Sequence, residues 1–382
     1  MKITNISVSE KGAQNEIRGL CGDFELWYRF PKHILPEMRA DAFIAASLIP
    51  AMFCGEDIVL DDEIPVSPLL LKNIEQLQDI FIMWGHGFGK VLRRIKVTGG
   101  ICIPPQSTND ATVSFFSGGV DGTHTFLKHR EEIDYLLFSK GIDIQLSNEE
   151  MYQVAFEKNV GFLKRKDKNL FPVETNVRFF GHEFGLTWIL CFGGGLSSIA
   201  LAGGFKKCFI ASSLSYADLY PHGSSFVSDH LWRNEHTEIK HDGAEATRID
   251  KIRFIAKDED ALNILRVCWH DKGYNCGECE KCLRTMASLR ILKLNAPTFP
   301  ECTDQLVREK ISKLKLYDNH DGAFMEENLA EARHVGDMVL VRALLKIKRN
   351  TGRRQMLHIL DETYLGNRLS LLKKKVGNLL SK

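Results

Sequence analysis

The sequence predicts an α/β protein built around a parallel sheet, with a four-cysteine module that follows the predicted strands in sequence. Strand-like runs alternate with helix-like segments from Ala111 onward, the pattern of parallel strands joined by crossover helices. A glycine turn at residues 117–121 lies between the first of these strands and the first helix. Four cysteines follow within residues 268–282.

Residues 1–105 form the first of three predicted domains, an N-terminal mixed α/β module rich in strands. The segment FELWYRFP, residues 24–31, alternates like a half-buried strand, and residues 41–53 suit an apolar helix. A further strand is predicted at residues 91–99. The proline pair in ICIPPQSTNDATV then breaks the pattern and marks a domain boundary.

Residues 106–300 form the second predicted domain, which holds the parallel sheet. Its predicted strands lie at residues 111–116, 133–143, 169–177 and 206–214, and its helices at residues 123–132, 148–165 and 185–204. The segment KHDGAEATRIDKIRFIA, residues 240–256, is predicted to open another helix.

Residues 301–382 form the third predicted domain, a helical and basic C-terminal extension. Apolar residues recur at helical spacing in residues 343–360 and 369–380. From Arg342 onward, eleven lysines and arginines stand against Asp361 and Glu362, which gives +9 there and −8 in the rest of the chain. Such helices either pack on the body with a solvated basic face or meet nucleic acid, an acidic protein or anionic lipid.

Length and composition are those of an ordinary globular protein. The chain has 382 residues, of which 44% are hydrophobic and 26% charged. No apolar run approaches the roughly 20 residues that a membrane-spanning helix needs. The first residues lack the apolar region of a signal peptide. We therefore expect no membrane span and a cytoplasmic location.

The glycine turn is the predicted phosphate-binding loop. A strand that enters a helix through glycines points successive backbone N–H groups outward, and the helix dipole favours an anion there. The loop is neither a Walker loop nor a dinucleotide-binding turn. A turn that serves only the backbone is the alternative. The predicted ATP- and pyrophosphate-binding residues are Ser117, Gly118, Gly119, Val120, Asp121, Gly122 and Thr123.

The four-cysteine module is the predicted metal site. Cys268, Cys276, Cys279 and Cys282 lie in RVCWHDKGYNCGECEKCLRTM, where two Cys-x2-Cys steps share Cys279. Tetrahedral Zn²⁺ takes four thiolates at about 2.3 Å, and Gly277 suits the tight turn that this geometry needs. We predict a structural zinc ion, because four protein ligands leave no position for water. An iron–sulfur cluster or catalytic thiols are the alternatives.

The loop resembles the signature of the N-type ATP pyrophosphatases, the PP-loop superfamily. These enzymes split ATP between the α and β phosphates, attach AMP to a substrate oxygen, and let an amine, ammonia or a sulfur donor displace the AMP. The resemblance implies a five-stranded parallel sheet, a loop that holds pyrophosphate, and Asp121 near the pyrophosphate or its Mg²⁺. The family writes serine after this aspartate, where the present sequence has Gly122.

Loop and cysteines together are similar to the 7-cyano-7-deazaguanine synthases, so the chain is QueC-like. The shared pattern is SGGVD followed by Cys-x7-Cys-Gly-x-Cys-x2-Cys-x-Arg, which ends here at Arg284. It covers residues 111–294, and the N-terminal module and C-terminal helices lie outside it.

Two polar segments between loop and cysteines supply the remaining site candidates. SSLSYADLYPHGSSFVSDHLW follows a predicted strand, which places Tyr216, Asp218 and Asp229 at the carboxyl edge of the sheet as substrate-binding residues. An ordinary polar loop is the alternative.

Arg248 and Lys251 follow on the next predicted helix. Lys251 matches a family position that reaches the phosphates, and a departing pyrophosphate needs cations. Asp121, Lys251 and Arg248 are therefore the catalytic candidates, with solvated surface charges as the alternative. His241 and Asp242 could cap this helix.

The resemblance implies an ATP-dependent C–N bond-forming ligase. It would adenylate a carboxylate, by preference a 7-deazapurine, release pyrophosphate, and form an amide, nitrile or amine conjugate. ATP is then a substrate with Mg²⁺, and ammonia or an amine is the donor. A sugar amidotransferase that makes amidino groups for surface polysaccharide, and a catalytically impaired nucleotide-binding regulatory protein, are the alternatives.

The expected partners are small molecules, with a protein acceptor or partner as a further possibility. Aromatic and basic residues interleave sparsely, so we do not expect nucleic acid. We expect a homodimer.

Overall fold

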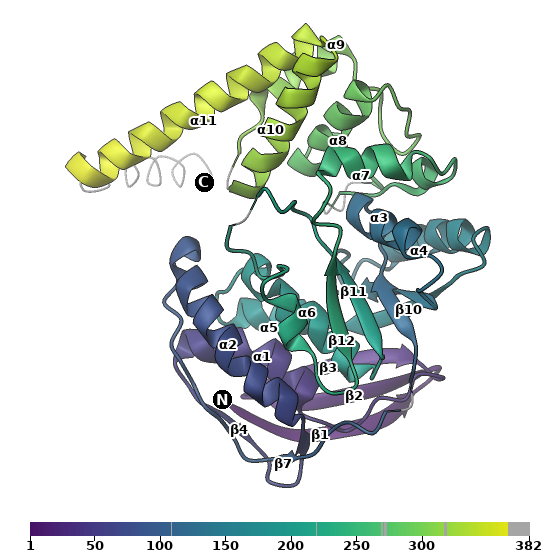
Figure 1. The fold of residues 1–382 in the computed structure, drawn as a ribbon, viewed down its shortest axis with the longest axis vertical. Helices are drawn as coiled ribbons and strands as arrows, with labels where there is room; N and C mark the ends of the chain where they lie inside the picture. The colour runs from purple at the N-terminus through teal and green to yellow at the C-terminus, as the bar shows by residue number, and fades with distance from the viewer. Residues whose placement is uncertain (108, 219, 269, 271–272, 317–318, 366–382) are drawn as a thin grey trace. The chain divides into compact units, whose positions relative to one another are not determined.

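The computed structural model describes residues 1–365, apart from residues 108, 219, 269, 271–272 and 317–318 (Figure 1). The chain forms two compact units. The first comprises Met1–Asn275 and Ala296–Thr298, and the second comprises Cys276–Asn295 and the chain from Phe299 onward. This division differs from the predicted domains, because the N-terminal module and the predicted parallel sheet lie in one unit.

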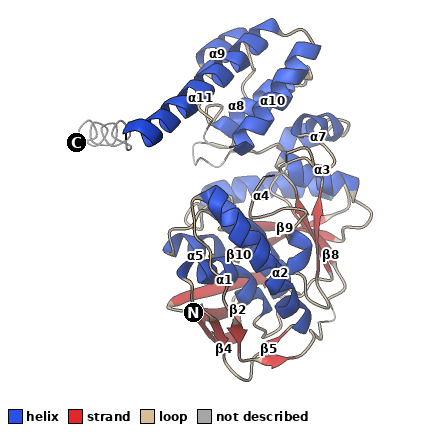
Figure 2. Cartoon of the chain, turned by 60° about the vertical axis from the view of Figure 1, so that its left-hand side comes forward, coloured by secondary structure: helices blue, strands red, loops and turns tan. Residues whose placement is uncertain are grey.

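Ten strands of the first unit form one mixed sheet (Figures 1 and 2). Its order is β12-β11-β8-β9-β10-β3-β2-β1-β4-β6, and β5 and β7 form a separate pair. The strands are β1 (Lys2–Lys11), β2 (Gln14–Cys21), β3 (Phe24–Pro31), β4 (Ile58–Leu60), β5 (Pro65–Val66), β6 (Val97–Thr98), β7 (Ile101–Cys102), β8 (Thr112–Phe115), β9 (Tyr135–Lys140), β10 (Asn169–Thr175), β11 (Lys207–Ala211) and β12 (Glu238–Asp242).

The N-terminal strands continue the parallel part of the sheet. The five neighbours β12, β11, β8, β9 and β10 are all parallel. β10 then pairs antiparallel with β3, in a register that sets Glu174 opposite Arg29 and Thr175 opposite Tyr28. Five strands of residues 1–105, namely β1, β2, β3, β4 and β6, therefore belong to the same sheet as the parallel strands.

The parallel strands reverse their order at β8. The chain passes from β8 outward to β9 and β10, and then returns to place β11 on the other side of β8. In open α/β sheets, the crevice at the carboxyl ends of the two strands that flank such a reversal is the usual ligand site. The loops that follow β8 and β11 meet this description.

Seven helices belong to the described part of the first unit. They are α1 (Asp41–Cys54), α2 (Pro68–Gly85), α3 (Val120–Lys128), α4 (Glu149–Lys164), α5 (Val177–Glu183), α6 (Trp188–Ala202) and α7 (Arg248–Ile255). α6 packs against α1 and α5, whereas α3 packs against α7. Figure 1 shows these two groups on opposite sides of the parallel strands.

Local chemistry explains several of these helix starts. The side chains of Ser67, Asn148 and Thr247 each accept a backbone N–H in the first turn of the helix that follows, and Pro68 occupies the first position of α2. α1 is buried along nearly its whole length, as its largely apolar sequence predicts.

The described part of the second unit is helical. It contains α8 (Glu280–Ile291), α9 (Asp304–Glu309), α10 (Asn319–His334) and α11 (Met338–Leu365). α10 packs on α8 and on α11. The helical prediction for the C-terminal region is confirmed up to Leu365, and the predicted helix at residues 369–380 lies outside the described residues.

Two element predictions differ from the structure. Only Val97–Thr98 of the segment 91–99 is a strand, because the preceding residues form a loop. The segment 240–256 does not begin as a helix: it contains the end of β12, and α7 starts at Arg248. None of the helices in the described ranges combines the length and the hydrophobicity needed to span a bilayer.

Candidate functional site

The glycine loop follows β8 and opens α3. Gly119 is the N-cap residue of α3 and has no side chain. The first backbone N–H groups of the helix therefore have no side-chain acceptor from the N-cap position. Gly118 adopts a φ of +75°, and a Cβ there would lie 2.7 Å from Asn159 Oδ1 and 2.9 Å from Ile264 O. Only glycine fits this position, because both its conformation and its surroundings exclude a side chain.

Buried polar groups without partners surround this loop. Asn159 on α4 is fully buried, and neither its Oδ1 nor its Nδ2 has a hydrogen-bond partner among the described residues. The Arg266 N–H donates to Gly118 O at 2.8 Å, while its buried Nε and Nη2 have no partner in the same part of the chain. Unpaired buried polar groups are costly, so their number favours a ligand or ordered water here.

Gly122 and Thr123 lie in the first turn of α3, directly after the loop. Thr123 is fully buried, and within the described ranges its hydroxyl has no partner. A Cβ at Gly122 would lie 3.1 Å from Phe115 O, against the end of β8. The Cβ of a serine at that position would therefore be in close contact with the backbone of β8.

The three catalytic candidates lie together. Arg248 Nη1 lies 2.6 Å from Asp121 Oδ2, and Lys251 Nζ lies 3.4 Å from Asp121 Oδ1. Lys251 Nζ also donates to Ser212 O at 2.6 Å. The packing of α3 against α7 brings these residues together across more than a hundred positions of sequence. We call this group the cation cluster.

The cation cluster is held out of water. Lys251 is 1% exposed, and burial is the largest effect on its ammonium group, lowering its pKa although Asp121 acts in the opposite direction. His124 on α3 lies nearby, and burial followed by the charge of Lys251 lowers the pKa of its imidazole. Asp121 thus contacts two cations, and Glu245 also acts on the charge of Lys251.

A polar recess opens beside the cation cluster. It measures about 320 Å³ and includes open solvent. Its lining residues are Ser212, Ser213, Leu214, Ser215, Asp218, Tyr220, His222, Ser224, Ser225, Phe226, His241 and Ala244. Ser212 belongs to both features, since its carbonyl accepts from Lys251 while the residue lines the recess.

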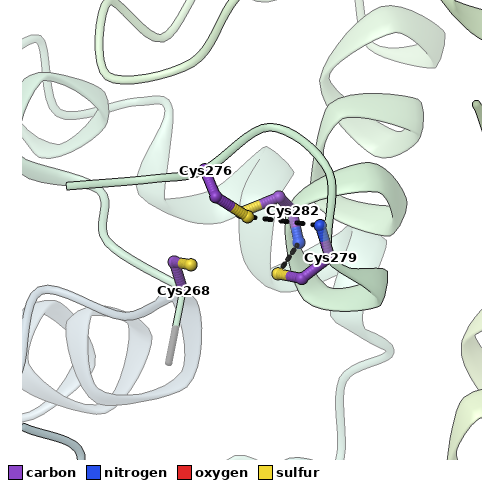
Figure 3. A group of neighbouring side chains, drawn as sticks. All are labelled: Cys268, Cys276, Cys279 and Cys282. Atoms are coloured by element: carbon purple, nitrogen blue, oxygen red, sulfur yellow. Dashed lines mark hydrogen bonds between the residues drawn. The ribbon is translucent and has the colours of Figure 1, made fainter. Parts of the chain in front are cut away.

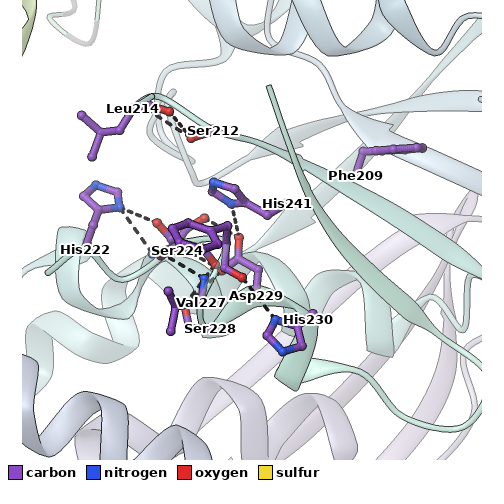
Figure 4. A network of polar contacts seen from close by, with 12 residues as sticks. Phe209, Ser212, Leu214, His222, Ser224, Val227, Ser228, Asp229, His230 and His241 are labelled. Carbon is purple, nitrogen blue, oxygen red and sulfur yellow. Dashed lines mark hydrogen bonds and ion pairs between the residues drawn. The ribbon is translucent and has the colours of Figure 1, made fainter. Parts of the chain in front are cut away.

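The structure places the three predicted substrate-binding residues differently. Asp218 lines the recess and accepts a hydrogen bond from Ser215 Oγ at 2.7 Å. Tyr216 is 53% exposed, and its ring meets Phe226 edge-on at 5.2 Å. Asp229 is fully buried and does not line the recess; its carboxylate pairs with His241, a lining residue, at 2.7 Å (Figure 4). Of the three, only Asp218 is a lining residue.

The four cysteines form a tetrahedron-sized cluster (Figure 3). The sulfur atoms of Cys268, Cys276, Cys279 and Cys282 all lie within 4.8 Å of one another. Sulfurs at about 2.3 Å from one zinc ion are separated by about 3.8 Å in a regular tetrahedron. Cys276 Sγ and Cys282 Sγ lie 3.8 Å apart. The cluster could therefore hold a metal ion such as zinc.

Backbone N–H groups support these sulfurs. The N–H groups of Glu278 and Cys279 point at Cys276 Sγ at 3.4 and 3.2 Å, and the N–H of Cys282 points at Cys279 Sγ at 3.5 Å. Gly277 adopts a φ of +65° inside this turn. Such contacts stabilise thiolates over thiols, as a metal site requires. The guanidinium of Arg284, which follows the last cysteine on α8, stacks on the ring of Phe324 at 3.9 Å.

Comparison of the chain with models of protein families, with curated proteins and with solved structures found no match.

Sequence reasoning missed Asn159, Arg266 and the position of His241. The buried positions of α4 are Tyr152, Ala155, Asn159, Phe162 and Leu163, so an asparagine interrupts an otherwise largely apolar face. That interruption is a signal a reader of the sequence could use. Arg266 gave no such signal, because it stands in a segment without regular structure.

Proposed function

We propose that the chain is an ATP-dependent ligase that adenylates a carboxylate, releases pyrophosphate and transfers the acyl group to ammonia or an amine. One observation carries this proposal: the buried cation cluster and the polar recess adjoin at Ser212. They lie where the loops after β8 and β11 flank the reversal of strand order.

The cation cluster suits the phosphate end of the reaction. The carboxylate oxygen attacks the α phosphorus of ATP, the bond from that phosphorus to the α–β bridging oxygen breaks, and pyrophosphate leaves with the electron pair. Lys251 and Arg248 would stabilise the charge that develops on the leaving group, and the N–H groups of the glycine loop would hold its oxygens. Asp121 keeps both cations in place.

Mg²⁺ that arrives with ATP would neutralise further phosphate charge. Asp121 is the carboxylate at the loop that would hold this ion. Its oxygens would then contact Mg²⁺ as well as Arg248 and Lys251.

The recess suits the acceptor end. Serine hydroxyls, Asp218 and two imidazoles line it, and Phe226 contributes a ring. A polar, planar heterocyclic acid fits this lining, which supports a 7-deazapurine carboxylate as the preferred acceptor.

We propose zinc for the four-cysteine cluster, with a structural role. All four ligands come from the chain, and the backbone N–H···S contacts fix the turn that carries three of them.

The test is pyrophosphate release from ATP and Mg²⁺, measured with a panel of acids. The panel contains 7-carboxy-7-deazaguanine and carboxylated sugars that can be amidated, each with ammonium chloride. We expect release that depends on one class of acid, together with exchange of labelled pyrophosphate into ATP. Tight ATP binding without release or exchange for any acid would overturn the ligase and favour a nucleotide-binding regulatory protein.

A further inference from the structure

An Asp–His pair lies at the edge of the recess, and neither of its residues belongs to the cation cluster. His241 lines the recess, and its Nδ1 lies 2.7 Å from Asp229 Oδ2 (Figure 4). This is the sole hydrogen bond of the His241 ring in the described part of the chain. The carboxylate accepts from Nδ1–H, so the lone pair of the imidazole stands on Nε2.

Asp229 is fixed before any ligand arrives. It is fully buried, accepts from Ser224 Oγ at 2.7 Å, and accepts from the Ser225 N–H at 3.1 Å. It belongs to the short 3-10 helix Asp229–Trp232. A carboxylate held in this way orients one tautomer of its histidine and stabilises the imidazolium that forms when Nε2 takes a proton.

α6 makes room for this arrangement. Gly193 on α6 donates its N–H to Gly223 O at 3.1 Å. A Cβ at Gly193 would lie 2.2 Å from Gly223 O and 3.0 Å from Asp229 Oδ1. The glycine therefore lets the loop that carries Ser224 approach the helix and surround Asp229.

The alternation of β12 separates two functions. Asp242 binds Thr125, Lys128 and His129 on the α3 side, while the preceding residue, His241, faces Asp229 and the recess. The ring of His241 thus lies in the part of the site proposed for the acceptor. Ser212 connects this part to the cation cluster, because its N–H donates to Asp242 O at 2.7 Å and its carbonyl accepts from Lys251.

We infer that His241 is the general base of the second half-reaction and that Asp229 is its positioning residue. This rests on the proposed function. In that step, the amine nitrogen attacks the acyl carbon, a C–N bond forms, and the bond from the acyl carbon to the AMP oxygen breaks. The electron pair leaves with AMP. The proton lost by the nitrogen goes to His241 Nε2 and then to water.

The nucleophile separates this role from a binding role. At neutral pH ammonia is present mostly as ammonium, which must lose a proton before its nitrogen can attack. Hydroxylamine is mostly unprotonated at this pH and traps acyl adenylates as hydroxamates with much less help from an enzymic base, its proton passing to water. The measured quantity is the ratio of ammonia-dependent to hydroxylamine-dependent product, formed from ATP and 7-carboxy-7-deazaguanine or whichever panel acid supports exchange. The ratio is independent of how well a variant binds the acid.

In His241→Gln we expect this ratio to fall about 10²-fold or more, the usual contribution of a general base. Asp229→Asn should lower it in the same direction, and added imidazole should restore ammonia-dependent product in His241→Ala. The control is His230→Gln, a change at an exposed histidine in the same segment, which should leave the ratio unaltered.

Two results would overturn the inference, and they are distinguishable. Equal losses with both nucleophiles in His241→Gln, with exchange present, would leave the ligase standing and reduce His241 to a binding residue. Absence of pyrophosphate exchange by the unaltered protein with every acid would remove the ligase itself, and the base with it.

Discussion

Lys251 shows at the scale of one residue how this site opposes stability. Its ammonium is almost fully buried, and the lowered pKa means that the fold disfavours the charged form. The unfolded chain therefore binds more protons between the folded pKa and the ordinary value of 10.5, and stability rises with pH through that window. A residue that costs stability in this way is a functional candidate.

We predict that Lys251→Met loses activity but not stability. Pyrophosphate exchange should fall about 10²- to 10³-fold, because a stabilising charge at the leaving group is removed. The free energy of unfolding, measured in urea at pH 7, should stay level or rise, since Arg248 still pairs with Asp121.

The control for this variant is Lys257→Met, a change at an exposed lysine just after α7. It should alter neither quantity. A large loss of stability in Lys251→Met, with exchange preserved, would mean that the lysine serves the fold alone.

Asp242 connects two elements, β12 and α3. Its carboxylate lies 2.9 Å from Thr125 Oγ1, 3.0 Å from Lys128 Nζ and 2.8 Å from His129 Nε2. Burial alone would raise the pKa of this carboxyl, but the hydrogen bonds from His129, Lys128 and Thr125 outweigh it and lower the pKa. The link fixes the end of the helix whose start forms the glycine loop.

We predict that Asp242→Asn destabilises the protein by about 2 kcal/mol at pH 7, because hydrogen bonds to a charged group are lost. A carboxyl group whose pKa is lower in the folded protein stabilises the fold at pH values above its unfolded pKa, which is near 3.8. This contribution disappears as the pH falls through the lower pKa of the folded state. The gap between the two proteins in urea unfolding should therefore close as the pH is lowered below that range.

Glu238→Gln, at the exposed start of the same strand, is the matched control and should change stability by less than about 0.5 kcal/mol. A gap for Asp242→Asn that stays constant with pH would contradict the account.

The elements of the parallel sheet could be predicted from the sequence better than the site could. Four strands, β8, β9, β10 and β11, fall where the apolar runs predicted them. Short apolar runs between turns are typical of buried strands in a parallel sheet. β12 was missed, since EIKHD is too polar to show a buried strand. The pairing of His241 with Asp229 was equally invisible, as it depends on a turn and not on a periodic pattern.

The candidate residues divide in the same way. Asp121 and Lys251 were named from motif position and Arg248 from its place on the same predicted helix as Lys251, and the structure brings the three together. Tyr216 and Asp229 were named only as polar residues after a strand. Nothing in the sequence tells which side chain of such a loop turns inward, so one is exposed and the other buried.

For the whole molecule, the four-cysteine cluster offers a direct test. We predict one zinc ion per chain by elemental analysis, and Cys279→Ser should lose it. Cys279 also precedes α8 as its N-cap, so the variant and the chelator-treated protein should both lose helical signal in circular dichroism.

Cys302→Ser is the matched control, because Cys302 lies outside the cluster and burial raises the pKa of its thiol to about 11. It should keep its zinc. A Cys279→Ser variant that retains one zinc ion per chain and full helicity would contradict a structural metal at this cluster.

The pairing of β10 with β3 governs the order in which the molecule can assemble. It joins residues 145 positions apart, so the N-terminal hairpins leave the ribosome long before their partner strand exists. Until then, β3 presents an unpaired edge of the kind on which chains associate wrongly. Contacts of such long range also fold slowly. The nascent chain thus passes through a period in which protection from aggregation has to come from something other than its finished sheet.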